Sequence, residues 1–95
     1  MIERHITFTV HPDRTDAFER FMTEEYGAAM ETSPGFVRFD LLREAESLTR
    51  YQMSFRFQDA DSAAGWRTSE VHLGLQPALT ALVTGTEIQG YVVVP

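Results

Sequence analysis

The sequence predicts an α+β fold in which a four-stranded antiparallel sheet carries helices on one face. Polar and apolar side chains alternate at residues 2–10, 36–43, 48–57 and 86–94, which is the period of a strand. After the first and the third of these predicted strands, apolar residues recur at spacings of three and four, as in helices that pack on a core. The resulting order of strand, helix, two strands, helix and strand is ferredoxin-like. A chain of 95 residues has room for one domain, residues 1–95.

The first predicted strand, residues 2–10, has a charged residue on its apolar face. Arg4 shares this face with Ile2, Ile6, Phe8 and Val10. A guanidinium in such a place needs an anionic partner, which could be the carboxylate of Asp40 or Glu87, or a bound ligand. Pro12 ends the strand because it cannot donate a hydrogen bond to a neighbouring strand.

The first helix is expected to begin with Asp13 or Thr15 as its N-cap and to end at the turn residues 33–35. Its inward stripe is predicted from the helical spacing of the apolar residues. The stripe consists of Phe18, Phe21, Met22 and Ala29, with Tyr26 and Met30 alongside.

The two middle strands are predicted to form a hairpin around a polar loop of four residues, 44–47. The second strand of the pair alternates strongly. One of its faces is aromatic and apolar, with Tyr51, Met53, Phe55 and Phe57.

The C-terminal helical region is predicted in pieces. A short helix runs to Trp66, and Ser69 is a good N-cap for the next one because its hydroxyl can accept from backbone N–H groups. Pro77 should kink or divide that second helix, and Gly85 is expected to close it. The last strand follows as residues 86–94.

Composition limits the classes of function. The formal net charge is −6, so repulsion from phosphates makes nucleic acid an unexpected partner. Cysteine, lysine and asparagine are absent, which rules out disulfides, thiolate metal sites and Schiff-base catalysis. The N-terminal residues do not form a signal peptide and no apolar run is long enough to span a bilayer, so we expect a cytoplasmic protein without a membrane partner.

No pattern for a cofactor or a metal stands out. The six glycines are scattered at turns and ends instead of forming a phosphate-binding loop. His5, Asp40 and His72 are too dispersed along the chain to predict a metal site. We therefore expect neither a cofactor nor a metal.

Trp66 and His72 form the most suggestive local pattern. The only tryptophan of the chain ends one predicted helix, and the histidine lies in the first turn of the next. An indole and an imidazole in these positions can converge on one wall of a pocket. The alternative is structural, because a single tryptophan in a small domain is often a core anchor.

Several short motifs occur in a recognisable order. They are Pro34-Gly35-Phe36, the strand 51–57, Asp59-Ala60, and then Trp66, Ser69 and His72. Together they resemble the antibiotic biosynthesis monooxygenase family of dimeric α+β barrels, over essentially the whole chain. The resemblance implies a homodimer in which two sheets pack face to face. It also implies oxidation of a small aromatic molecule, such as an anthrone, without metal or flavin.

Carried over residue by residue, the resemblance gives mixed support. Trp66 matches the family tryptophan that lines the substrate pocket, whereas the asparagine that the cofactor-free oxygenases use is missing. Other members of the family degrade haem with an asparagine and an axial histidine, and Arg4 and Gln76 occupy those positions here. Glutamine is a poor ligand for haem iron, so haem degradation is not expected.

The candidate site follows from these arguments. His72 is the expected catalytic base because its unperturbed pKa lies near neutrality, with His5 as a second candidate. Arg4, or Arg67, is expected to stabilise an oxyanion. The predicted substrate-binding wall consists of Phe21, Met22, Phe39, Tyr51, Phe55, Trp66 and Leu75. A competing hypothesis is a non-catalytic dimeric ligand-binding or stress-response protein whose cavity is filled by side chains.

Overall fold

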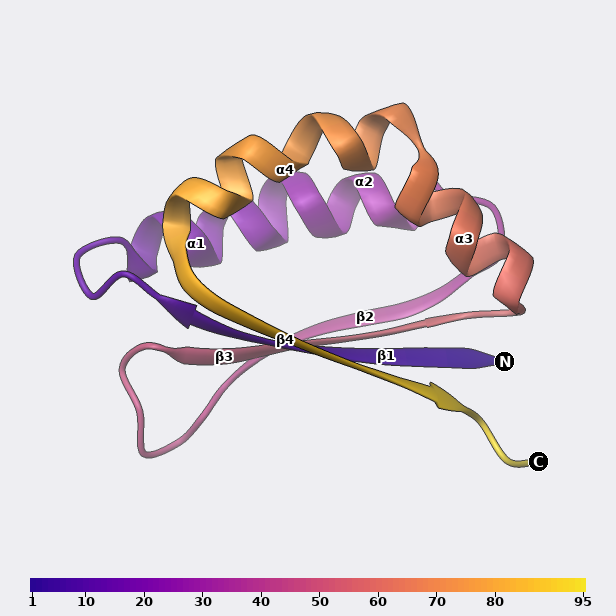
Figure 1. The fold of residues 1–95 in the computed structure, drawn as a ribbon, viewed down its shortest axis with the longest axis horizontal. Coiled ribbons are helices and arrows are strands. Elements are labelled where there is room, and N and C mark those ends of the chain that lie inside the picture. Colours follow the sequence, from indigo (N-terminus) through magenta and orange to yellow (C-terminus); the bar gives the residue numbers. More distant parts are fainter.

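The computed structural model describes residues 1–95 and contains one four-stranded antiparallel sheet (Figure 1). In space the strands run in the order β2-β3-β1-β4. Their bounds are β1, Ile2–Val10; β2, Phe36–Arg43; β3, Arg50–Phe57; and β4, Val83–Val92. β1 and β3 are the central strands, and β2 and β4 form the edges.

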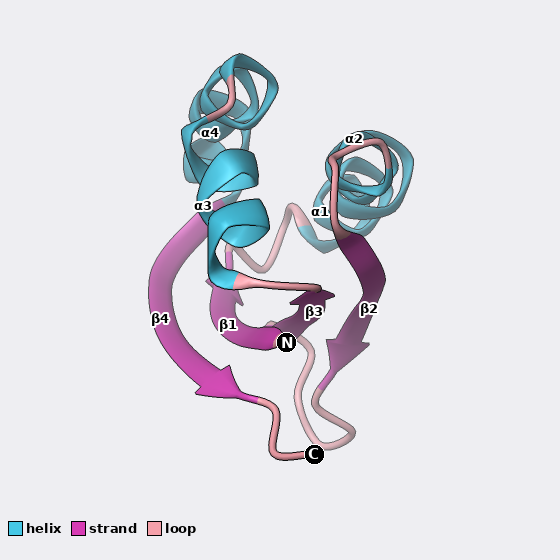
Figure 2. Ribbon diagram, turned by 90° about the vertical axis from the view of Figure 1, so that its right-hand side faces the viewer, coloured by secondary structure: helices cyan, strands magenta, loops and turns pink.

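All helices cover the same face of the sheet (Figure 2). The first helical rod lies over the side of the sheet that ends in β2, and α3 and α4 lie over the side that ends in β4. The helical segments are α1, Thr15–Phe21; the π-helical η1, Met22–Tyr26; α2, Gly27–Glu31; α3, Ala60–Thr68; and α4, Glu70–Leu82. The predicted ferredoxin-like α+β fold is thereby confirmed. None of the helices is long and apolar enough to cross a membrane.

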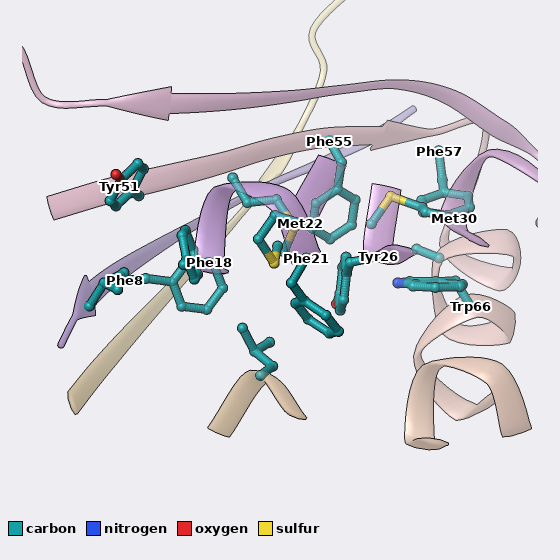
Figure 3. Packing of buried hydrophobic residues seen from close by; sticks show 14 residues of the cluster. Phe8, Phe18, Phe21, Met22, Tyr26, Met30, Tyr51, Phe55, Phe57 and Trp66 are labelled. Atoms are coloured by element: carbon teal, nitrogen blue, oxygen red, sulfur yellow. The ribbon is translucent and has the colours of Figure 1, made fainter. Parts of the chain in front are cut away.

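The core lies between the helices and the sheet, where fourteen buried side chains form one cluster (Figure 3). β3 contributes the four side chains of its predicted apolar face, Tyr51, Met53, Phe55 and Phe57, all buried. Aromatic rings meet at an angle throughout this layer, as between Phe18 and Tyr51, whose centroids are 4.9 Å apart. Tilted and edge-to-face contacts of this kind are favourable for aromatic side chains.

The first helix widens into a π-helical turn because its buried residues are spaced by four. Phe18, Met22, Tyr26 and Met30 are each 2% exposed or less. In a regular α-helix a step of four residues overshoots a full turn by about 40°, so these four side chains would drift off one face. The π turn takes up an extra residue and returns Tyr26 and Met30 to the inward side. Thr23 supports this turn by donating to the carbonyl of Glu19 at 2.8 Å.

Two predicted helix ends are wrong. The N-cap of α1 is Arg14, without any side-chain hydrogen bond, instead of Asp13 or Thr15. At the other end of the chain, Gly85 does not close α4, because the helix ends at Leu82 and the chain enters β4 at once. The strand itself satisfies the next backbone groups, so no glycine is needed there.

Pro77 does not divide the second C-terminal helix. α4 continues through it from Glu70 to Leu82. Ser69 is the N-cap, as predicted, and its hydroxyl accepts from the backbone N–H of His72 at 3.1 Å. The position of His72 is therefore set by the residue that starts the helix.

The face of the sheet opposite the helices carries a network of charges around Glu3. Its carboxylate accepts from His5 at 2.7 Å and from Arg38 and Arg56 at 2.9 and 2.7 Å. Arg38 also pairs with Asp40. These hydrogen bonds, above all those from His5 and Arg56, lower the pKa of Glu3 to about 2. Face-to-face pairing of two such sheets stays a prediction, because the structure is that of one chain.

Candidate functional site

A cavity of about 180 Å³ lies on the helix side of the sheet, between β1, β4 and the helices α3 and α4. Its polar lining comes from Arg4, Tyr26, Arg67, His72, Gln76, Thr80 and Thr86. Its apolar lining comes from Ile6, Phe8, Phe55, Ala63, Trp66, Leu79, Val83 and Ile88. The cavity therefore combines an apolar body with a few polar groups, as is usual for small-molecule sites.

Trp66 forms one end of the cavity and is only 3% exposed. Its ring makes edge contacts with Tyr26 and His72, with centroids 5.6 and 5.2 Å apart. The indole nitrogen points toward Tyr26 (Figure 3) and has no hydrogen-bond partner. A buried N–H without a partner carries a desolvation cost, which an acceptor atom on a ligand would remove.

His72 is held beside Trp66 by two contacts. Its backbone N–H is bound by the Ser69 hydroxyl, and its side-chain Nε2 lies 3.1 Å from Nε2 of Gln76, one turn further along α4. Burial lowers the pKa of His72 below its ordinary value, whereas the backbone of Arg67 raises it and the positive charge of the Arg67 side chain lowers it. The imidazole is therefore neutral at neutral pH and able to accept a proton.

Tyr26 is a lining residue that sequence analysis placed only beside the helical stripe. It is 2% exposed, and burial raises its pKa to about 12, although the nearby Trp66 and Gln76 side chains act in the opposite direction. The phenol therefore stays protonated and can donate a hydrogen bond into the cavity. The four-residue spacing from Met22 to Met30 was the signal that could have revealed its inward position.

Arg4 and Arg67 bring two positive charges to the cavity. Arg4 is half-buried and forms no ion pair or side-chain hydrogen bond, and burial together with the charge of Arg67 lowers its pKa. Neither carboxylate considered as its partner reaches it. Asp40 pairs with Arg38, and Glu87 lies beside Thr7 on the other face. No aspartate or glutamate lines the cavity.

Residues 1–78 match the family model of the antibiotic biosynthesis monooxygenases. The chain belongs to this family. A comparison with curated proteins finds no significant match in sequence. Like the fold, the family membership predicted from the sequence motifs is confirmed.

Solved structures of the family superpose over nearly the full chain. SnoaB, a cofactor-independent oxygenase from Streptomyces nogalater, is 27% identical with a TM-score of 0.80, and the match covers 99% of this chain and 93% of SnoaB. A protein assigned as an antibiotic biosynthesis monooxygenase of Nitrosomonas europaea is 21% identical with a TM-score of 0.88, and both chains are covered in full. A Deinococcus radiodurans protein with the same assignment is 12% identical with a TM-score of 0.91, covering 100% of this chain and 94% of the other.

In this member of the family, four of the predicted site residues line the cavity. They are the predicted base His72, the predicted oxyanion stabiliser Arg4, and the predicted wall residues Trp66 and Phe55. They converge from α4, β1, α3 and β3, so the fold brings together residues that are far apart in the sequence. Arg67, considered as an alternative to Arg4, also lines the cavity, from an exposed position.

The other predicted wall residues lie elsewhere. Phe21 and Met22 are buried in the core, and Leu75 is half-buried against it. Phe39 packs on the first helical rod, where a Cβ added to Gly27 would lie 3.0 Å from its ring. None of the four contributes to the lining of the cavity.

Tyr51 and His5 also lie away from the cavity. Tyr51 is buried at the far end of β3 and donates a hydrogen bond to Glu19. Burial and that carboxylate raise its pKa to about 12. His5 lies on the open face, paired with Glu3 and 4.7 Å from the ring of Tyr91. No group of three or more histidine, aspartate or glutamate side chains gathers in a way that would hold a metal ion.

Proposed function

We propose that this protein is a monooxygenase that oxidises a small phenolic or quinone-like aromatic substrate without a cofactor. The observation that carries the proposal is the cavity beside Trp66, whose lining includes both His72 and Arg4. Family membership and the likeness to SnoaB, a cofactor-independent oxygenase, support the same reaction class. A protein whose cavity is filled would not offer a base and a cation to one ligand.

His72 acts as the general base. A neutral imidazole takes the proton of the substrate hydroxyl and leaves an electron-rich phenolate. Burial keeps the imidazole neutral before the reaction, and Gln76 and Ser69 hold its orientation. The developing negative charge in turn stabilises the imidazolium that forms.

Arg4 stabilises the phenolate. Its guanidinium has no carboxylate partner and lies on the strand face that lines the cavity. A charge that is already in place and poorly solvated stabilises an anion more strongly than water does. The phenol of Tyr26 and the indole N–H of Trp66 are further donors from the same wall.

The oxidation itself balances between the substrate and oxygen. A phenol with a free para carbon reacts with O₂ to give a quinone and water. The carbon loses a hydrogen and gains one oxygen atom, and the second oxygen atom leaves as water. All four electrons taken up by O₂ come from the substrate, so the protein supplies only the base, the cation and a cavity that excludes water.

Oxygen uptake in the presence of a panel of naphthols with a free carbon para to the hydroxyl tests this function. The wild-type chain should consume oxygen and form quinone in equal amounts, and the His72→Ala variant should lose most of this activity. His5→Ala is a matched control, because it removes the same side chain from the opposite face of the sheet. Loss of equal size in both variants would contradict the assignment of His72 as the base. No uptake by the wild type with saturable binding would favour the non-catalytic ligand-binding hypothesis.

We also propose that the active form is a homodimer, as the family resemblance implies. Exposed apolar side chains on the sheet and its β4 edge, among them Leu42 and Tyr91, support this proposal. Sedimentation equilibrium of the wild type and of Leu42→Glu tests it, since a charge in the interface should shift the protein to monomer. A wild-type chain that sediments as a monomer at all concentrations would contradict the proposal.

A further inference from the structure

We infer that the substrate of this cavity is an aromatic hydroxy acid of one or two rings, whose permanent carboxylate is bound by Arg4 and Arg67. The inference rests on the proposed function for the hydroxyl group, but the carboxylate part concerns binding alone. It therefore stands or falls separately from any oxidation.

The first argument is the balance of charge in the cavity. Two guanidiniums line it without any carboxylate, in a chain that has 14 acidic and only 8 basic residues. On the other face of the sheet, by contrast, Arg38 and Arg56 pair with Glu3, and Arg50 pairs with Glu44. An anion is what the cavity lacks.

The second argument is that a phenolate alone does not account for two arginines. Before the reaction a phenol is neutral, because its pKa is near 10, so it gives no compensation for two unpaired charges that repel one another. Burial lowers the pKa of Arg4, and the charge of Arg67 lowers it further, as expected for two like charges that line one cavity. A carboxylate is ionised throughout and matches the planar donors of a guanidinium, so it compensates from the moment of binding.

The third argument is the distribution of the remaining donors. The side chain of Trp66 is only 3% exposed, and its indole N–H has no acceptor. The indole nitrogen points toward Tyr26, another residue of the cavity wall (Figure 3). These groups are suited to a neutral hydroxyl or carbonyl oxygen beside His72. The cavity thus offers donors for two different groups of one ligand, an acid and a phenol.

The size of the cavity limits the ring system. A closed apolar cavity of about 150 Å³ is known to hold one benzene molecule. The volume here is about 180 Å³ and the wall is open near β4, where Ile88 is 63% exposed. One or two rings fit this space, whereas a third ring would extend past Ile88 into solvent.

Matched ligands separate the acid from the ring. We would measure quenching of Trp66 fluorescence by 1-hydroxy-2-naphthoate, by its methyl ester and by 1-naphthol under anaerobic conditions, with correction for their absorbance. The acid should bind about tenfold or more tightly than either neutral compound, as expected for a charge-assisted bidentate contact, and the difference should shrink at high salt. Equal affinities of acid and ester would overturn the inference.

Variants assign the preference to the two arginines. Arg67→Gln alters an exposed side chain and should reduce the advantage of the acid, and adding Arg4→Gln should abolish it. Arg56→Gln on the open face is the control and should leave it unchanged. An advantage that survives in the double variant would contradict the assignment. Acid binding that depends on both arginines, without oxygen uptake, would refute the oxidation and leave this inference intact. Oxygen uptake together with equal affinities for acid and ester would refute this inference and leave the oxidation intact.

Discussion

Glu3 and Arg4 are neighbours on β1 and point to opposite faces of the sheet, where they meet different surroundings. Glu3 receives hydrogen bonds from His5, Arg38 and Arg56. Arg4 receives no counter-charge, and its nearest charged neighbour in the cavity is another arginine. The fold therefore contains the means to neutralise charges on a strand and uses them on one face only.

The difference between the surroundings of Glu3 and Arg4 suggests that one residue serves stability and the other serves function. A carboxylate surrounded by three donors is stabilised in the folded state, and its removal leaves those donors without a partner. An unpaired, half-buried arginine costs free energy in the folded state, and such costs are typical of functional sites. The two faces can therefore be distinguished by substitutions that affect stability in one case and activity in the other.

The two histidines give the largest expected contrast. His72→Ala should reduce the rate of oxygen uptake by roughly 100-fold or more, the usual contribution of a general base, whereas His5→Ala should change it by less than about threefold. Steady-state rates at saturating substrate check this. A large loss in His5→Ala with normal folding would mean that the reacting site is on the open face.

Removal of Glu3 should give the largest loss of stability. Glu3→Gln is expected to lower the free energy of unfolding by about 2 kcal/mol, because Arg38, Arg56 and His5 lose a charged acceptor. Urea denaturation at pH 7 measures this. The stability that Glu3 supplies is complete above its ordinary pKa of 4.5 and is lost as the pH falls toward its folded value of about 2, so wild type and variant should converge in strong acid.

Removal of the Arg4 charge should change the free energy of unfolding in the opposite direction. Arg4→Met keeps an unbranched side chain on the apolar strand face and removes an unpaired charge, so it should raise the free energy of unfolding by about 1 kcal/mol while weakening anion binding. Arg56→Met is the matched substitution on the other face and should be destabilising. Both variants can be compared by thermal denaturation. A destabilised Arg4→Met would indicate that the guanidinium has a structural partner after all.

The smallest effect concerns pH near neutrality. Burial lowers the pKa of His72 below its ordinary value of 6.5, so the unfolded chain binds a proton at a pH where the folded chain does not. Stability should fall slightly as the pH drops below 6.5, and activity should fall with protonation of the base. Urea melts of wild type and His72→Gln between pH 7.5 and pH 5 isolate the effect, since Glu3 titrates only at lower pH.

Strand and helix periodicity predicted the fold, and alternation along β1 with the position of Trp66 and His72 at a helix junction pointed to three of the residues that line the cavity. The alternation of side chains along a strand is enough to tell on which face of the sheet Arg4 lies, and this does not depend on the length of the loops. Phe21, Tyr51 and Leu75 were expected in the wall because they belong to the correct layer. Sequence alone does not tell which part of that layer is filled by neighbouring side chains and which part stays open.

The remaining errors have local causes. Tyr26 was placed at the side of the helical stripe because a regular α-helix was assumed, and a π turn breaks that assumption. Gly85 was taken as a helix end because glycine often follows a helix, whereas here α4 passes directly into β4 at Val83. In both cases a tertiary arrangement overrides a local rule.

The π turn at Met22–Tyr26 has a consequence for tracing the ancestry of this helix. A relative that lacks the turn has one residue fewer between Phe18 and Met30, and the gap in a correct alignment then lies inside the helix instead of in a loop. An alignment that moves the gap to the nearest loop would assign the wrong residue to the place of Tyr26. Deletion of the exposed Thr23 should accordingly be tolerated better than deletion of any residue in α4, since it would leave a regular helix.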